Sequence, residues 1–286
     1  MTDPFFTRLN RRAAHIDSLL CIGLDPEPDR LPNSLRAAPP HEAALDFLCR
    51  IVDATHDLVA AYKPNLAFFE ALGPPGLESL RTLRRHIPPD VPVVGDAKRG
   101  DIDNTMRRYA AALFDVYDFD AVTASPYLGR DAIEPFAERP KRGVYLLCRT
   151  SNPGSGEIAD LDVVDARGER TPLYLTIAQR VQAWNTNRNL GLVVGATYPE
   201  ELARVREVAP DLPILLPGVG PQGGALEAAV AAGLDRNRAG LLVNASRQVL
   251  YASAADDFPA AARRVAEQLR ERINRARSSV RPTTRT

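Results

Sequence analysis

Eight short apolar runs alternate along the chain with longer amphipathic stretches, and this alternation constrains the fold more than any other feature. We expect strands over residues 18–24, 61–65, 91–98, 121–125, 143–150, 190–197, 213–219 and 240–246. We expect helices over residues 42–60, 76–86, 103–117, 130–139, 173–185, 199–209, 225–232 and 258–277. Strand–helix alternation predicts a parallel sheet with helices on its outside. Eight such units in 286 residues predict an α/β fold with a single domain over residues 1–286, a (β/α)₈ TIM barrel.

The charge balance and the apolar patterning exclude several classes of partner. Basic and acidic residues number 36 each, so no global field favours nucleic acid or an anionic membrane. The chain begins Met-Thr-Asp-Pro-Phe-Phe, without a basic-then-apolar signal pattern, and no apolar run approaches the ~18 residues that cross a bilayer. Cys21, Cys49 and Cys148 lack CxxC spacing, and we expect reduced thiols. These features predict a cytoplasmic protein that binds neither nucleic acid nor membrane.

Two segments do not fit the regular alternation. Residues 151–171 form the longest expected loop, and they contain Pro153, Gly154 and Gly168. A loop of this length in a compact domain is either functional or disordered, and we expect a lid. The basic C-terminal residues 278–286 are predicted to be a frayed tail.

Polar residues collect where the predicted strands end. They are Asp25, Lys63, Asp96, Lys98, Ser151, Gln222 and Arg247. The carboxyl ends of the strands carry the active site in a barrel of this kind. We therefore expect these side chains to meet at one mouth of the barrel.

The segment 93–102 concentrates charge at the end of an apolar strand. Asp96 and Lys98 are two residues apart, so their side chains point to the same side, and Lys63 approaches from the neighbouring strand. Burying such charges is costly unless they are paired. A surface loop with chance charges, or a structural ion-pair network, is the alternative interpretation of this segment.

A glycine-rich turn over residues 216–223 contains GxGxxG between an expected strand and an expected helix. A single GxGxxG match is weak evidence for a dinucleotide-binding site, and its position late in the chain argues against one here. Glycines still let backbone N–H groups approach an anion at a helix N-terminus, and barrels often bind phosphate after strands seven and eight. Arg247 follows on the next strand and would supply a guanidinium. The alternative is a tight turn beside a surface arginine.

No spacing of histidine and acidic residues indicates a metal site. His15, His41, His56 and His86 all lie in helical or pre-helical stretches away from the strand ends. The sequence therefore predicts no bound transition metal.

Taken in order, the strand-end motifs resemble the orotidine 5′-phosphate decarboxylase family, in particular its longer bacterial subgroup. The resemblance extends from about residue 19 to residue 251. The matching motifs are Gly23-Leu24-Asp25-Pro26, Lys63-Pro64-Asn65, Asp96-Ala97-Lys98-Arg99-Gly100-Asp101-Ile102, Pro217-Gly218-Val219-Gly220-Pro221-Gln222-Gly223-Gly224 and Ser246-Arg247. Two departures are the Asn244-Ala245-Ser246 segment, where many relatives are glycine-rich, and extra residues in the expected lid.

The resemblance implies conversion of orotidine 5′-monophosphate to UMP, in de novo pyrimidine biosynthesis, without a cofactor. It implies a homodimer with shared active sites, to which Asp101, Ile102 and Thr105 contribute across the interface. The remaining implied roles are Asp25 and Lys63 at the ribose, Asn65 in substrate binding, Asp96 and Lys98 at C6, Ser151 at the pyrimidine, and Gln222 and Arg247 at the phosphate.

Decarboxylation at C6 leaves an electron pair that cannot delocalise into the ring. The protein must therefore supply electrostatic stabilisation and a proton, and Lys98 is the expected donor. Asp96 and Asp101 would keep Lys98 charged. Two alternatives stay open: a Mg²⁺-dependent sugar-phosphate lyase or decarboxylase on a related barrel, such as a hexulose-phosphate synthase, and a non-catalytic nucleotide-binding barrel.

Overall fold

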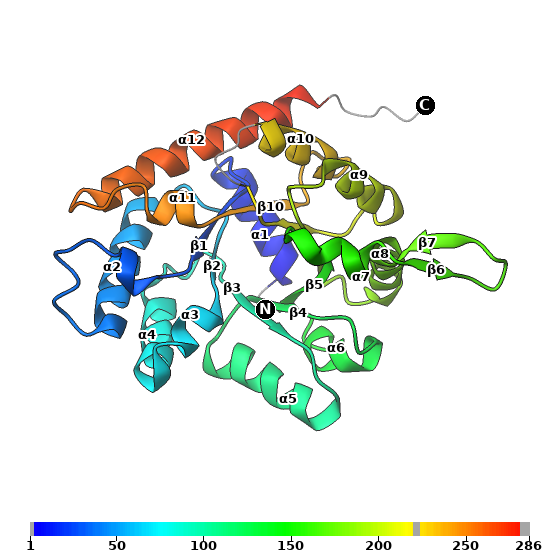
Figure 1. Ribbon diagram of the computed structural model, residues 1–286, viewed down its shortest axis with the longest axis horizontal. Coiled ribbons are helices and arrows are strands. Elements are labelled where there is room, and N and C mark those ends of the chain that lie inside the picture. The colour runs from blue at the N-terminus through cyan, green and yellow to red at the C-terminus, as the bar shows by residue number, and fades with distance from the viewer. Residues whose placement is uncertain (1–2, 220–223, 281–286) are drawn as a thin grey trace.

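Eight parallel strands form a barrel in the computed structural model, which describes residues 3–219 and 224–280. Their order is β2-β1-β10-β9-β8-β5-β4-β3, and isolated bridges from Tyr62 to Val93 and from Asn65 to Asp96 join β2 to β3 (Figure 1). The strands are β1 Leu20–Leu24, β2 Ala61–Pro64, β3 Val94–Arg99, β4 Ala121–Ala124, β5 Gly143–Arg149, β8 Leu190–Val194, β9 Ile214–Leu216 and β10 Leu241–Ala245. Each overlaps an expected strand, and the predicted barrel is confirmed.

Helices surround the barrel on its outside (Figure 1). Those that overlap expected helices are α2 Pro40–Thr55, α4 Gly73–His86, α5 Asp103–Ala111, α6 Arg130–Ala137, α8 Leu173–Trp184, α9 Pro199–Val208, α10 Gly224–Gly233 and α12 Phe258–Ser279. Two of them, α2 and α5, end more than a turn before the expected residue. α2 stops at Thr55 because the chain must turn into the sheet, where Ala60 N donates to Leu20 O over 2.8 Å. α5 gives way to a π-helical turn, Ala112–Val116.

Several short elements were not expected from the sequence. They are α1 Phe5–His15, a 3₁₀ turn Pro28–Arg30, α3 Leu66–Glu70, a 3₁₀ turn Pro153–Ser155, α7 Gly156–Ala159, β6 Asp162–Val164, β7 Arg170–Pro172 and α11 Arg247–Leu250.

Helix α1 closes the barrel at the amino ends of its strands. Phe5 is fully buried against the start of β5, where a Cβ on Gly143 would lie 2.2 Å from its ring. The ring of Tyr145 meets those of Phe5 and Phe6 edge-on, with centroids 6.2 and 5.3 Å away. Arg8 pairs with Asp120, just before β4. This packing leaves the opposite mouth, at the carboxyl ends of the strands, for polar chemistry.

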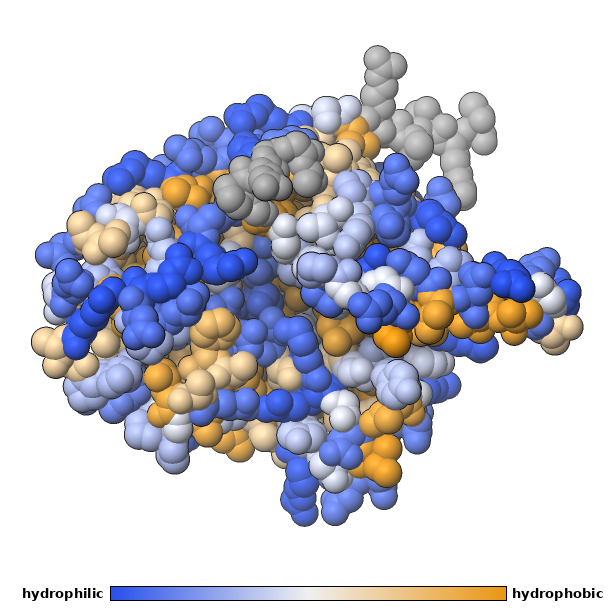
Figure 2. Space-filling model, in the orientation of Figure 1, coloured by the Kyte–Doolittle hydropathy of each residue, from blue (hydrophilic) through white to orange (hydrophobic). Residues whose placement is uncertain are grey.

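The segment after β5, expected to be a loop over residues 151–171, contains short helices and a pair of strands. β6 and β7 pair as an antiparallel hairpin that projects from the body of the molecule (Figure 1). Apolar side chains are exposed along it and just before it, including Leu161, Val163 and Val164 (Figure 2). Its role as a lid stays a prediction. The tail was expected over residues 278–286. Its first two residues belong to α12, which continues to Ser279, and residues 281–286 lie outside the described residues.

The three cysteines are free, and two of them are core residues. Burial raises the pKa of Cys21 and of Cys148 to about 12, and that of half-buried Cys49 to about 11. The thiols therefore stay protonated at neutral pH. Across the described ranges, no helix is long and apolar enough to cross a membrane.

Candidate active site

Asp96 is the centre of a buried ionic network at the mouth of the barrel. It is the third residue of β3 and is only 8% exposed. Lys63 Nζ, from β2, donates to Asp96 Oδ2 over 2.7 Å, and Lys98 Nζ donates to Asp96 Oδ1 over 2.6 Å. The structure thus brings together the three charged residues that the strand pattern placed at one mouth.

Thr123 organises this network from the neighbouring strand β4. Its hydroxyl donates to Asp96 Oδ1 over 2.9 Å and accepts from the backbone N–H groups of Ala97 and Lys98. The register between β3 and β4 shifts between Gly95 and Arg99, and Lys98 has a positive φ of 47°. Thr123 was not predicted from the sequence, where its signal was one polar residue inside an apolar run.

The two lysines differ in their surroundings. The Lys63 side chain is 5% exposed, whereas that of Lys98 is 48% exposed and open to solvent at the mouth. Burial by itself disfavours the Lys63 ammonium, but the charges of Asp96 and Asp25 outweigh it and raise its pKa. Burial likewise opposes ionisation of Asp96, but Lys63 and Lys98 outweigh it and hold its pKa well below the usual range. Asp96 is therefore ionised and Lys63 protonated at neutral pH.

Asp25 lies beside this network, at the end of β1. Its Oδ2 accepts from Ser246 Oγ over 2.7 Å, while its buried Oδ1 has no partner within the described chain. A Cβ on Gly23 would come within 2.8 Å of Ser246 Cβ, so glycine lets the ends of β1 and β10 approach. An unpartnered carboxylate oxygen at a barrel mouth is suited to accept a hydroxyl of a ligand.

Asn65 lies next to the Asp96 network, whereas the predicted site residues that follow β3 make no described contact with it. Asn65 pairs with Asp96 through a parallel bridge, and its Oδ1 caps α3 by accepting from Ala67 N over 3.1 Å. Asp101 Oδ1 accepts from Ile102 N over 2.8 Å, and no hydrogen bond or ion pair described in this chain joins it to Lys98. Ile102 and Thr105 are exposed. The structure does not bring these last three residues onto the Asp96 network of their own chain.

Ser151 lies between two glycine turns on the other side of the mouth. A Cβ on Gly195 would lie 2.8 Å from Ser151 Cβ, and one on Gly218 would lie 3.0 Å from it. Gly218 has a φ of 89°, which an L side chain rarely adopts. Gln248 Nε2 donates to Val219 O over 3.0 Å and supports this turn. Loops after β5, β8 and β9 therefore converge around Ser151.

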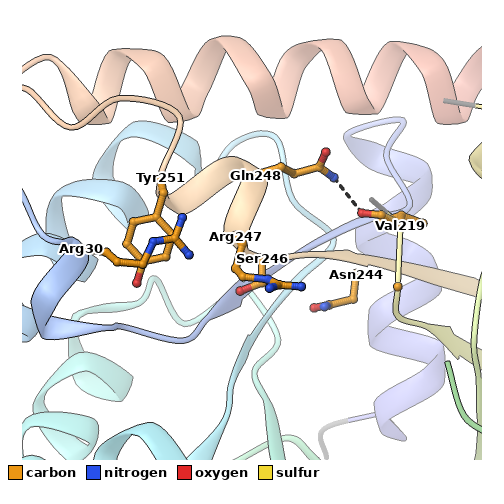
Figure 3. Close-up of a pocket in the computed structure, with 8 residues that line it drawn as sticks. Arg30, Val219, Asn244, Ser246, Arg247, Gln248 and Tyr251 are labelled. Carbon is orange, nitrogen blue, oxygen red and sulfur yellow. Dashed lines mark hydrogen bonds between the residues drawn. The ribbon is translucent and has the colours of Figure 1, made fainter. Parts of the chain in front are cut away.

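A cavity of about 590 Å³ opens beside this turn (Figure 3). The residues that line it include Gly218, Asn244, Ser246 and Arg247, together with Arg30, which was not predicted from the sequence. Gln222 lies outside the described residues. The cavity joins the predicted phosphate elements, a glycine turn and an arginine, in one space. Over the residues that the structure describes, no group of three or more His, Cys, Asp or Glu side chains could hold a metal ion.

The class of this protein is a TIM-barrel enzyme. Its strands form a closed parallel barrel, and two lysines are ion-paired with one aspartate at the mouth where the carboxyl ends of the strands meet. The sequence model of the "Orotidine 5'-phosphate decarboxylase / HUMPS family" matches residues 18–265. The chain belongs to this family, as its strand-end motifs predicted.

Relatives and solved structures agree with this assignment. The orotidine 5′-phosphate decarboxylase of Thermomicrobium roseum is 52% identical over 277 residues, which cover 96% of this chain and 97% of that protein. The structure of Leishmania donovani OMP decarboxylase is 42% identical with a TM-score of 0.82, covering 96% of this chain and 100% of the other. Leishmania donovani UMP synthase is 44% identical with a TM-score of 0.85; the match covers 97% of this chain but 57% of that one. The expected enzyme class, a carboxy-lyase, is confirmed.

Proposed function

We propose that this chain removes the C6 carboxylate of orotidine 5′-monophosphate to give UMP, as a step of de novo pyrimidine synthesis in the cytoplasm. The observation that carries the proposal is the position of Lys98. Its ammonium is held by Asp96 at 2.6 Å and is still half exposed to the space above the barrel, where a substrate would lie.

The reaction needs a positive charge and a proton at one carbon atom. When the bond from C6 to the carboxylate breaks, CO₂ leaves and the electron pair stays on C6. A fixed ammonium stabilises that developing charge, and it need not reorganise during the reaction. Lys98 then donates a proton to C6 and regains one from solvent. Asp96 supports this role because its carboxylate accepts from the ammonium and orients it.

The rest of the mouth provides for the remote parts of the nucleotide. In this proposal Asp25 and Lys63 bind the ribose, with Asn65 as a further substrate-binding residue beside them. Ser151 contacts the pyrimidine ring. The glycine turn, Gln222 and Arg247 bind the phosphate. Binding energy from a phosphate far from C6 can support ordering and closure at the reacting centre.

We also propose a homodimer with shared sites. The loops after β3 and β4 start side by side, since Ser125 N donates to Arg99 O over 2.8 Å and a Cβ on Gly100 would lie 3.1 Å from Ser125 Cβ. Large apolar side chains are exposed on both loops, with Ile102 59% and Tyr127 83% accessible. A second copy that covers this rim would bring Asp101, Ile102 and Thr105 toward the neighbouring mouth. This supports the contribution of Asp101 to the C6 site of the other subunit.

The test is an ultraviolet assay of orotidine 5′-monophosphate with purified protein, no added cofactor and prior dialysis against EDTA. We expect conversion to UMP at the undialysed rate. Activity that disappears and returns with Mg²⁺ would instead support a metal-dependent lyase. Binding of UMP without release of CO₂ would support a nucleotide-binding barrel and overturn the proposed reaction.

A further inference from the structure

The cavity that contains Arg247 also contains a second guanidinium. Arg30 ends the 3₁₀ turn Pro28–Arg30 after β1 and lines the cavity with Arg247 (Figure 3). Arg30 and Arg247 are the charged residues of the described lining, which includes no carboxylate. Two positive charges without a negative one match the charge of a phosphate monoester, which carries about −1.5 to −2 at neutral pH.

Arg30 is held in place by an aromatic platform. Its Cζ lies 3.9 Å from the centroid of the Tyr251 ring, a distance typical of a cation–π contact. The Tyr251 ring is in turn stacked on the fully buried ring of Phe47, with centroids 5.9 Å apart and an interplanar angle of 13°. The guanidinium therefore rests on a stack that begins in the protein core.

The same tyrosine connects Arg30 to the Asp25 segment. Tyr251 Oη accepts from Glu27 N over 2.6 Å and donates to the backbone oxygen of Asp25 over 3.2 Å. Movement of the ring would thus displace the backbone next to the proposed ribose site. Arg30 is fixed relative to Asp25 even though it lies near the surface.

The existing ion pair of Arg30 leaves it able to bind an anion. Nη1 lies 3.1 Å from Glu27 Oε1, and the two side chains are 42% and 39% exposed. Ion pairs this exposed contribute little, because water screens them. A guanidinium has five N–H groups, so one contact to Glu27 leaves donors for a phosphate.

From this arrangement we propose that Arg30 is a second phosphate-binding residue, which acts with Arg247 on the 5′-phosphate of the nucleotide. The inference rests on the proposed function and adds to it a residue that the strand-end motifs do not contain. Tyr251 is the corresponding positioning residue: it holds the guanidinium without touching the phosphate.

The experiment is a calorimetric titration of UMP and of uridine into purified protein. The variants are Arg30→Gln, Arg30→Lys, Tyr251→Phe, Tyr251→Leu and, for the proposed phosphate site itself, Arg247→Ala. Arg236→Gln is the matched control, because Arg236 is 74% exposed on the loop before β10, at the opposite end of the barrel. Thermal melts verify that each variant is folded.

We expect Arg30→Gln to lower the affinity for UMP about 3- to 20-fold. The effect is modest because solvent screens the charge of a half-exposed group. Uridine binding should not change. Arg30→Lys should lose less affinity for UMP than Arg30→Gln, because it keeps the charge. Tyr251→Phe should keep most of the affinity, and Tyr251→Leu should lose it in part, since only the second removes the ring. Arg236→Gln should bind UMP like the parent protein.

Two results would overturn this inference and leave the proposed function intact. In one, Arg30→Gln binds UMP with normal affinity while Arg247→Ala does not. In the other, Arg30→Gln weakens the binding of uridine as much as the binding of UMP. A parent protein that binds UMP no better than uridine would also overturn the phosphate site of the proposed function, and Arg247→Ala would then have no effect either.

Discussion

Lys98 donates to Asp96 over 2.6 Å from a backbone with a φ of 47°. A non-glycine residue in this region is strained by on the order of 1–3 kcal/mol and persists where its surroundings hold it. Thr123 does so, because its hydroxyl accepts from the N–H groups of both Ala97 and Lys98. The fold thus stabilises an unfavourable backbone in order to direct one lysine toward the mouth.

Lys98→Ala should abolish turnover and leave the fold intact. The side chain is half exposed, and without it Asp96 still binds Lys63 and Thr123. The measurements are the ultraviolet assay and a thermal melt, with Lys141→Ala as the control for an exposed lysine at the other end of the barrel. Near-normal turnover by a folded Lys98→Ala variant would remove Lys98 from the proton-donor role.

Asp96→Ala should destabilise the protein, by contrast. It leaves the ammonium of Lys63, whose side chain is 5% exposed, without its buried partner. Removing one member of a buried pair costs about 3–5 kcal/mol. Urea unfolding measures this loss, and Asp101→Ala on the neighbouring loop should change the free energy of unfolding far less. Equal stability of the two variants would show that Lys63 finds another partner or loses its charge.

The stability of the protein should also depend on the ionisation of Asp96 in acid. Its pKa in the folded state lies below the ordinary value of 3.8, so the unfolded chain binds the proton first. The stabilisation is then complete above about pH 4 and is lost as the pH falls through the folded-state pKa. Asp96→Asn should flatten this part of the curve of unfolding free energy against pH. An unchanged acid limb would assign that dependence to other carboxylates.

The sequence predicted much of this site because strand geometry is simple. Asp96 and Lys98 are two residues apart on one strand and Lys63 lies on the next, so their meeting follows once the sheet is parallel. Thr123 could not be assigned in this way. Its role depends on the register of β4 against a bulged β3, which local patterns do not encode.

Other misses have different physical causes. The burial of Phe5, Leu9 and Ala13 follows a helical period, so α1 had a readable signal. β6 and β7 have three residues each and are largely exposed, which leaves no burial pattern to detect. The contact of Arg30 with Tyr251 joins residues far apart in the chain, and no local rule brings them together.

Complementation between inactive subunits tests the shared site. Asp101 follows Gly100 on a loop that leaves the barrel mouth, and it makes no described contact with Lys98 of its own chain. Lys98→Ala and Asp101→Ala proteins, each inactive, should recover activity when mixed, because a heterodimer contains one site with both groups. Subunit exchange is verified by native mass spectrometry. Exchange without recovered activity would mean that Asp101 serves its own chain.

Arg247→Ala should act through the phosphate alone. Arg247 begins α11 and lines the cavity beside the Gly218 turn, away from the Asp96 network. A hydrogen bond to a charged group contributes about 1.5–3 kcal/mol, so kcat/KM for orotidine 5′-monophosphate should fall roughly 10- to 100-fold or more. The slow turnover of orotidine, which has no phosphate, should barely change. Equal proportional losses for the two substrates would show that Arg247 supports the structure or the chemistry at C6 instead of phosphate binding.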